Sequence, residues 1–378
     1  SLLSQVEVRR GLTYKPNDVR SKGARVLRSS NIVDDSFVIS DDDVFVSKDV
    51  INIPRVSNGD ILVTAANGST KLVGKHAIIK HLPDDEIVVH GGFMLLFKTE
   101  QNFFVNAWMS SNEYKRVLQF VQGGNGAIGN LSSAILKSMK MSVPSLPEQS
   151  AIGTIFRTLD DLLAYYKDNL ANYQFLKTTM LSKMFPKDGQ PVPEIRMNGF
   201  EGEWETKILS EVTNITMGQS PKSENYTDNP NDYILVQGNA DIKDKQVVPR
   251  LWTTEVTKMA EIGDIILTVR APVGDIGKTD YNVVIGRGVA AIKGNDFIFY
   301  TLEKMKMTGF WNRFSTGSTF ESISSNDIKE AIIQIPTLKE QQAIGAYFLN
   351  LDNLINSHQE KISQLETLKK KLLQDMFI

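Results

Sequence analysis

Residues 144–185 read PSLPEQSAIGTIFRTLDDLLAYYKDNLANYQFLKTTMLSKMF, and residues 336–377 read PTLKEQQAIGAYFLNLDNLINSHQEKISQLETLKKKLLQDMF. The second stretch begins 192 residues after the first and aligns with it over 42 positions without a gap. Sixteen positions are identical, among them Pro144/Pro336, Glu148/Glu340, Gly153/Gly345 and Phe185/Phe377. The match indicates an internal repeat, and a repeat of this kind fixes the architecture before any other feature is considered.

Both copies are predicted to be long helices, because a proline stands upstream and an acid, Glu148 or Glu340, lies in the first turn. Apolar residues recur at alternating spacings of four and three, which is typical of a coiled-coil seam. In the first copy the seam is Ile152, Phe156, Leu159, Leu163, Tyr166, Leu170 and Tyr173, and in the second it is Ile344, Phe348, Leu351, Ile355, His358, Ile362 and Leu365. Each helix would be about 50 Å long. We therefore expect an antiparallel spacer, related by a pseudo-twofold axis, with a globule at either end.

The remaining segments, 1–143 and 187–335, correspond to each other more faintly. The paired stretches are Gly59–Thr64 with Gly263–Thr268, Gly74-Lys75 with Gly277-Lys278, Ser132-Ser133 with Ser324-Ser325, and Leu27–Ile32 with Leu235–Ile242. Short apolar runs bounded by Gly, Asn and Asp predict strands at Ile61–Val63, Phe93–Phe97, Ile265–Leu267 and Val283–Ile285. One helix per domain is expected, at Asn112–Phe120 and Tyr300–Phe314.

The predicted fold class is α+β, with two mixed α/β domains separated by the two helices. The domain boundaries are 1–143 for the first globular domain, 144–186 for the first spacer helix, 187–335 for the second globular domain and 336–378 for the second spacer helix. Pro186 ends the first helix, and residues 187–193 (KDGQPVP) form a linker.

The composition limits the function. The chain has 378 residues and no cysteine, which excludes disulfides, thiolate zinc sites and cysteine nucleophiles and suits a reducing cytoplasm. No uncharged apolar run reaches 18 residues, so no membrane span is expected. The net charge of −2 argues weakly against nucleic acid, but seven Lys and Arg residues lie between Arg9 and Arg28 with Asp18 as the only acid.

The whole chain resembles the specificity subunit of type I restriction–modification systems. The blocks Pro144–Gln149 and Pro336–Gln341 resemble those that open the two spacer helices in that family, and the Gly-Asp-Ile element followed by a Gly-Lys pair resembles part of its target-recognition domains. One departure concerns the beginning of each domain. Gly199–Trp204 introduces Leu209–Val212, whereas the first domain begins almost directly at Leu3–Val6, so we expect a few residues before Ser1.

The resemblance implies a non-catalytic DNA reader with one half of an asymmetric, two-part site per domain. It also implies the partners, which are double-stranded DNA, two modification subunits that methylate adenine N6, and two restriction subunits that translocate and cut DNA. S-adenosylmethionine, ATP and Mg²⁺ would belong to those partners, and the chain itself would hold no cofactor and no metal.

Two alternatives come from other classes of protein. One is a coiled-coil scaffold whose heads bind proteins or glycans. The other is a stand-alone nuclease that uses Asp84, Glu113 and Lys115 as a metal site, although the second domain has no counterpart of this triad. An adenine methyltransferase would need an Asn/Asp-Pro-Pro-Tyr/Phe motif to hold the flipped base. The only similar stretch, Asp228–Asn231, reads DNPN and does not match it. The four histidines lack metal-site spacing, and His358 on the seam is expected in the core.

Residues that could read DNA were sought among Arg, Lys, Asn, Gln, Ser and Thr near glycine-rich loops, because Arg reaches guanine while Asn and Gln reach adenine. In the first domain the candidates are Arg9, Arg10, Lys15, Arg25, Arg28, Ser29, Asn31, Asn67, Ser69, Thr70, Lys71, Gln122 and Asn125. In the second domain they are Gln219, Lys222, Gln237, Asn239, Arg270, Arg287, Ser318 and Thr319.

Overall fold

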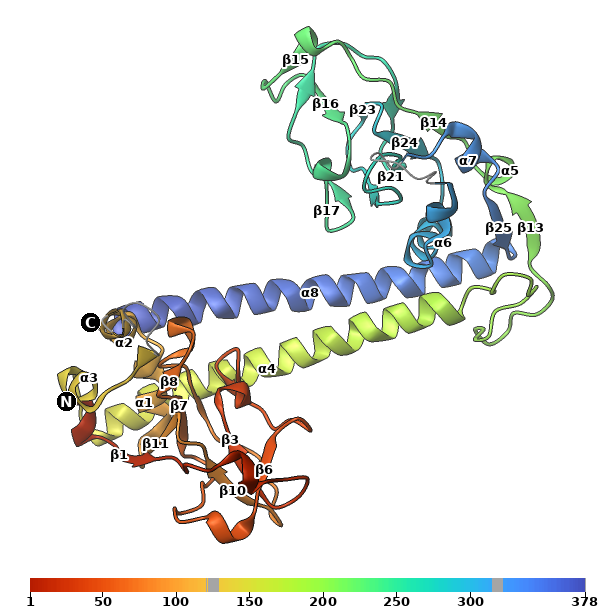
Figure 1. Ribbon diagram of the computed structural model, residues 1–378. Helices are drawn as coiled ribbons and strands as arrows, with labels where there is room; N and C mark the ends of the chain where they lie inside the picture. Colours follow the sequence, from red (N-terminus) through yellow and green to blue (C-terminus); the bar gives the residue numbers. More distant parts are fainter. Residues whose placement is uncertain (120, 122–128, 315–321, 378) are drawn as a thin grey trace. The chain divides into compact units, whose positions relative to one another are not determined.

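Two compact units make up the computed structural model, which describes residues 1–119, 121, 129–314 and 322–377. Unit 1 comprises Ser1–Lys167 together with Glu360–Ile378, and unit 2 comprises Asp168–Gln359. The two long helices are α4 (Leu146–Lys183) and α8 (Leu338–Met376). Each unit therefore holds one globular part and a portion of both helices (Figure 1).

Helices α4 and α8 run antiparallel within each unit. In unit 1 the Phe156 ring lies 5.8 Å from the Phe377 ring, and Lys167 forms an ion pair of 2.9 Å with Glu366. The residue number therefore rises along α4 as it falls along α8. In unit 2, Tyr173 packs against His358 at 5.2 Å, while Phe185 packs against Phe348 at 6.0 Å. The predicted antiparallel pair and internal repeat are confirmed.

Most of the predicted seam is buried. The buried members are Ile152, Phe156, Leu159, Leu163, Ile344, Phe348, Leu351, Ile355 and Leu365. Tyr166, Leu170, Tyr173, His358 and Ile362 are half-buried. Burying one such aliphatic or aromatic side chain contributes about 1.5–3 kcal/mol, so the seam is a large part of what joins the helices.

A glycine near the start of each long helix brings a second helix close. A Cβ on Gly153 would lie 3.0 Å from the backbone nitrogen of Phe104, in α1 (Asn102–Met109). A Cβ on Gly345 would lie 2.7 Å from the Cβ of Asp296, in α6 (Asp296–Met307), which lies beside α8 in Figure 1. The identity of these two glycines in the repeat thus has a packing reason.

Unit 1 is built on two four-stranded sheets, ordered β1–β11–β7–β9 and β10–β3–β6–β2. The strands of the first sheet are β1 (Glu7–Arg10), β11 (Met94–Lys98), β7 (Ile61–Thr64) and β9 (His76–Ile78). Those of the second are β10 (Ile87–His90), β3 (Ala24–Leu27), β6 (Val44–Val46) and β2 (Val19–Arg20). Two small pairs are β4 (Ile32–Val33) with β5 (Ser36–Phe37) and β8 (Ala66–Asn67) with β12 (Gly129–Asn130). The further helices are α2 (Asn112–Leu118) and α3 (Ser133–Ser138).

Unit 2 contains a six-stranded sheet, β14–β24–β21–β22–β18–β17, a five-stranded sheet, β15–β19–β16–β23–β20, and the pair β13–β25. The six strands are β14 (Ile215–Met217), β24 (Val289–Ile292), β21 (Ile265–Thr268), β22 (Ile276–Lys278), β18 (Gln246–Val247) and β17 (Ile242–Lys243). The five are β15 (Tyr226–Thr227), β19 (Trp252–Thr253), β16 (Tyr233–Val236), β23 (Val283–Ile285) and β20 (Met259–Ala260). The pair consists of β13 (Glu205–Ile208) and β25 (Ile332–Ile335), and two short helices are α5 (Leu209–Val212) and α7 (Ser325–Lys329).

The strand register corrects one predicted correspondence. Gly74 donates from its backbone N–H to the Thr64 carbonyl at 2.8 Å, and Gly274 does the same to Thr268 at 2.9 Å. Both glycines have a positive φ, +84° and +87°. The counterpart of Gly74-Lys75 is therefore Gly274-Asp275. Gly277-Lys278 lies within β22, where it pairs with Ile265-Ile266 of β21.

Two further expectations need correction. Leu2, whose N–H donates to the Met139 carbonyl, is the counterpart of Leu209, whose N–H donates to Ala331, so the predicted match at Leu3 is shifted by one residue. The helix expected at Tyr300–Phe314 starts at Asp296 and ends at Met307. A separate 3-10 helix, Phe310–Phe314, follows Gly309, whose φ of +70° breaks the helix. Unit 1 holds α1 and α3 as well as the expected α2.

Within the described part of the chain, none of the helices combines the length and apolarity that crossing a bilayer requires.

Candidate nucleic-acid interface

Each unit carries a cleft at an equivalent place in its fold. The unit 1 cleft has a volume of about 730 Å³, and the unit 2 cleft about 580 Å³. The unit 1 cleft is lined by Leu12, Thr13, Tyr14, Pro16, Val19, Arg28, Ser29, Ala66, Asn67, Gly68, Gly91, Gly92, Phe93 and Met94. The unit 2 cleft is lined by Ser220, Pro221, Lys222, Ser223, Tyr226, Gln237, Gly238, Asn239, Arg270, Ala271, Arg287 and Gly288.

The same backbone geometry underlies both clefts. In unit 1 a Cβ on Gly11 would come within 1.9 Å of the Gly91 carbonyl oxygen, and in unit 2 a Cβ on Gly218 would come within 2.0 Å of the Gly286 oxygen. Only glycine permits such an approach of two chain segments. Gly91 also donates to Leu27 at 2.9 Å and Gly286 to Val236 at 2.8 Å. The two clefts are therefore repeat-related surfaces.

The unit 2 cleft is lined by polar and cationic side chains. Arg270 and Arg287 are exposed, and among the described residues neither guanidinium forms an ion pair or a side-chain hydrogen bond. Gln237 donates from Nε2 to the Tyr226 hydroxyl at 2.7 Å, and Asn239 donates to Asp275. Two arginines with free donors beside positioned amides are the groups that recognise base edges and phosphates.

The unit 1 cleft brings together three of the predicted residues. Arg28 is exposed, and Asn67 donates from Nδ2 to the Ser29 hydroxyl at 3.3 Å. Much of the remaining lining is apolar or glycine. The two clefts thus share a backbone but differ in chemistry, as expected of two domains that read different sequences.

Arg25 and Asn31, both predicted to contact DNA, are buried inside unit 1, and the prediction is corrected for them. Arg25 donates to both oxygens of Glu86, at 2.7 and 3.0 Å, and to Asp43 at 2.7 Å. The hydrogen bond to Glu86 raises the pKa of Arg25 and the same contact lowers that of Glu86, so both stay charged. Asn31 donates to Asp43 at 2.7 Å and accepts from the Arg28 N–H at 2.7 Å.

These buried groups hold the loop that presents Arg28. In unit 2 the counterpart of Asn31 is Asp241, which accepts from the Gln237 N–H at 2.7 Å and from Arg250 at 3.0 Å. Each domain therefore fixes its cleft loop through one buried polar side chain. The predicted match between Leu27–Ile32 and Leu235–Ile242 has this role in common.

The other predicted residues lie outside the cleft linings or outside the described residues. Arg9, in β1, donates to Glu7 at 2.7 Å. The exposed residues outside the linings are Arg10, Lys15, Ser69, Thr70, Lys71 and Gln219. Gln122, Asn125, Ser318 and Thr319 lie outside the described residues.

The cleft linings also include residues that were not predicted from the sequence, among them the larger side chains of Tyr14, Val19, Phe93 and Tyr226. Tyr14, Val19 and Phe93 are aromatic or apolar side chains, which do not belong to the residue types that read base edges through charged or amide groups. Phe93 does carry a signal in the sequence: Gly91-Gly92 directly precedes it, and a pair of glycines is typical of a loop where two chain segments come close together.

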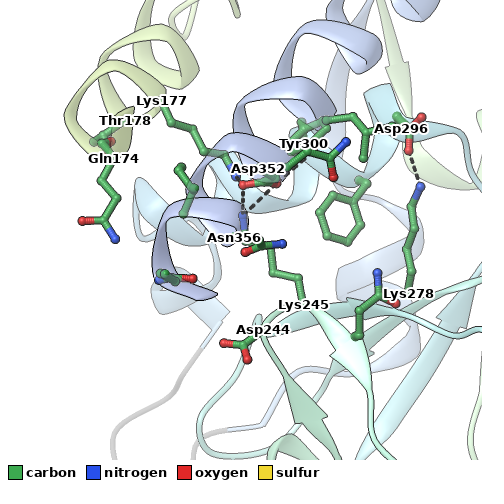
Figure 2. A pocket seen from close by; sticks show the side chains of 16 residues that line it. Gln174, Lys177, Thr178, Asp244, Lys245, Lys278, Asp296, Tyr300, Asp352 and Asn356 are labelled. Carbon is green, nitrogen blue, oxygen red and sulfur yellow. Dashed lines mark hydrogen bonds and ion pairs between the residues drawn. The ribbon is translucent and has the colours of Figure 1, made fainter. Parts of the chain in front are cut away.

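A second hollow in unit 2 holds a charged cluster (Figure 2). Lys177 of α4 bonds to Asp352 of α8 at 2.6 Å and to Glu303 at 2.9 Å, and Lys245 bonds to Glu303 at 2.6 Å. Tyr300 donates its hydroxyl to Asp352 at 2.9 Å. Burial lowers the pKa of Lys177 and raises that of Tyr300, whose hydroxyl therefore stays protonated and keeps donating. The two lysines balance the two carboxylates, so the cluster joins α4, α6 and α8.

The residues of the alternative nuclease site do not form a metal centre. Glu113 forms an ion pair with Arg116 at 2.6 Å. In the described ranges no group of three His, Cys, Asp or Glu side chains is placed to hold a metal ion. His76 and His90 are buried in unit 1, where burial lowers the pKa of both imidazoles.

The comparison with protein families identifies the chain. A family model described as the type I restriction modification DNA specificity domain matches it twice, at residues 6–172 and 201–367. The chain therefore belongs to the type I restriction–modification DNA specificity family, and the twofold match coincides with the internal repeat. The family is that of the non-catalytic specificity subunits of type I restriction enzymes, whose role is DNA recognition.

Individual relatives agree with this assignment. A putative type I restriction enzyme specificity subunit, MjaX, of Methanocaldococcus jannaschii is 28% identical over 385 residues, covering 97% of this chain and 89% of the relative. The EcoKI specificity subunit of Escherichia coli K12 is 28% identical over 173 residues, covering 44% of this chain and 36% of the relative.

Solved structures share the fold. The specificity subunit of a type I system from M. genitalium superposes with a TM-score of 0.65 at 14% identity, covering 100% of this chain and 95% of that one. A chain from a study of complex assembly and conformational transition of a type I system has a TM-score of 0.52 at 21% identity, with 98% and 96% covered. Neither alternative function gains support from these relatives.

Proposed function

We propose that the chain reads a two-part, asymmetric DNA site, with unit 1 and unit 2 each recognising one half. The observation that carries this proposal is the pair of clefts with the same backbone geometry and different linings. A symmetric protein would present one lining twice and would read a palindrome. Here the unit 2 cleft presents Arg270 and Arg287, whereas the unit 1 cleft presents Phe93. The two clefts therefore bind different DNA sequences, and the two half-sites differ.

The chain also serves as the scaffold of a larger enzyme. We propose that it binds two modification subunits, which methylate adenine N6 with S-adenosylmethionine, and two restriction subunits, which use ATP and Mg²⁺. This part of the proposal rests on the family and on a structural neighbour that was studied as an assembled type I system. The cofactors belong to those partners, and the protein would act in the cytoplasm, where the DNA is.

The experiment is reconstitution of methylation. The purified chain alone, the modification subunit alone and the two together are incubated with genomic DNA and S-adenosylmethionine, and methylated adenines are mapped by sequencing. We expect methylation only in the mixture, at one sequence with two separated specific parts. Methyl transfer by this chain alone, or metal-dependent cutting by it, would contradict the non-catalytic assignment. Methylation at a single palindromic site would contradict the two-reader proposal.

A further inference from the structure

Three equivalent positions differ in chemistry between the clefts. Ala65 donates its N–H to the Phe93 carbonyl at 2.9 Å, and Val269 donates to the Gly288 carbonyl at 2.9 Å, so Phe93 and Gly288 are counterparts. The residues next to these four are therefore also counterparts: Ala66 corresponds to Arg270, and Gly92 corresponds to Arg287. Unit 1 therefore has Ala66, Gly92 and Phe93 where unit 2 has Arg270, Arg287 and Gly288. Unit 1 thus has small residues where unit 2 has two arginines, and an aromatic ring where unit 2 has a glycine.

Phe93 presents its ring to solvent at the edge of the unit 1 cleft. Phe93 is 67% exposed, although its neighbour Met94 is buried in β11. Val19, on the same cleft, is 44% exposed, and Tyr14 also lines it. An exposed apolar patch within a binding surface marks a contact that becomes buried on binding. Arg28 lies on the same cleft and gives it a positive charge, which favours binding of the DNA polyanion.

We propose that Phe93 is a specificity-determining residue that contacts a thymine methyl group in the major groove of the half-site read by unit 1. This inference rests on the proposed function and adds the base chemistry that the cleft selects. The thymine C5-methyl group is the apolar feature that distinguishes one base edge in the major groove, and phenylalanine is among the side chains that contact it. The cleft of unit 2 instead presents two guanidinium groups that have no side-chain partner among the described residues, and such groups reach guanine edges or phosphates.

Uracil tests the inference because it pairs like thymine and lacks only the methyl group. Duplexes carry the methylated site found above, with each thymine of the unit 1 half-site replaced in turn by uracil. Binding of the assembled methyltransferase is measured with the wild-type chain and with Phe93→Ala. We expect one uracil substitution to weaken wild-type binding about fourfold, the effect of one buried methyl group, and to leave the variant unaffected. Phe93→Leu, which keeps an apolar contact, should retain most of the sensitivity to uracil.

Uracil at the thymines of the unit 2 half-site is the matched control, and Phe93→Ala should not change the response to it. If wild-type binding stays site-specific but no uracil in the unit 1 half-site weakens it, the inference is wrong and the proposed function stands. If Phe93→Ala weakens binding to thymine and uracil duplexes equally, Phe93 inserts or packs without reading the methyl group, and the inference is again wrong. If the wild-type complex shows no site-specific binding even to the duplex with all its thymines, the proposed function is wrong as well.

Discussion

Lys177 donates a hydrogen bond of 2.6 Å to Asp352 and so ties helix α4 to helix α8 within unit 2. The repeat contains the same pair in unit 1, where Lys369 lies 2.6 Å from Asp160. The surroundings differ, because the lysine side chain is 7% exposed in unit 2 and 21% in unit 1, and the aspartate side chain is 16% exposed in unit 2 and 36% in unit 1. The same ion pair therefore occurs twice in the chain, once largely buried and once more accessible to solvent.

Replacing the buried Lys177 with methionine is expected to lower the free energy of unfolding by about 1–3 kcal/mol, because it leaves the half-buried carboxylates of Asp352 and Glu303 with less than their full set of partners. Lys369→Met is the matched control and should cost less than about 1 kcal/mol, since the half-buried Asp160 carboxylate stays in contact with water. Urea unfolding of the full chain gives both values. Equal losses for the two variants would contradict the role assigned to burial.

The buried imidazole of His76 predicts a loss of stability in acid. Its Nδ1 lies 3.1 Å from the Gly74 carbonyl and its Nε2 3.3 Å from that of Asn106, and burial lowers its pKa. Below about pH 6.5 the unfolded chain binds a proton on this histidine that the folded chain does not. Stability therefore falls as the pH falls, by up to about 1.4 kcal/mol per pH unit for each such histidine. Urea unfolding between pH 7.5 and 5.5 measures this slope, to which His90 adds.

His76→Gln should reduce the slope of stability against pH. The control is His81→Asn, at an exposed position whose φ of +55° asparagine tolerates, and it should leave the slope unchanged. An unaltered slope in the His76 variant would remove this histidine from the account.

Arg28 is the charged group of the unit 1 cleft, and Arg28→Ala should weaken DNA binding. A contact to guanine would cost about 1–3 kcal/mol and relax one position of the half-site, whereas a phosphate contact would weaken all sequences alike and reduce the salt dependence. Competition binding against single-position variants of the site separates these cases. Arg25→Ala is a contrasting variant, because Arg25 is buried and holds the loop: its loss should lower the free energy of unfolding, and any loss of binding should be the same for all sequences. Unchanged affinity in Arg28→Ala would remove Arg28 from the site.

The helix pair is expected to set the unread spacer between the half-sites. Duplicating Asp168–Ala171 together with its repeat counterpart Glu360–Ser363 adds about 6 Å to each helix and nearly preserves the seam. At about 3.4 Å per base pair, the preferred spacer should lengthen by one or two base pairs, with DNA twist absorbing the remaining rotation at a cost of a few kcal/mol. The methylated consensus of the mutant complex is the readout. An active mutant with an unaltered spacer would show that another feature sets the distance.

The repeat and the seam were predictable because both are local patterns: Phe156 and Phe348 stand at the same position of a fixed period. Arg25 could not be placed, since its partner Glu86 lies 61 residues away and only the folded sheet brings them together. The pairing of Gly74 was misjudged for a similar reason, because a Gly-Lys dipeptide recurs by chance and only the strand register identifies Gly274 as its equal. Phe93 was missed because an exposed aromatic side chain looks like core in a sequence.

The central claim is that two independent readers share one chain, and exchange of one reader tests it most directly. Residues 187–335 are replaced with the matching segment of a relative that recognises a different site, and methylated adenines are mapped for the reconstituted enzyme. The account predicts that one half-site changes while the other half-site stays as it was. A simultaneous change of both half-sites would contradict it.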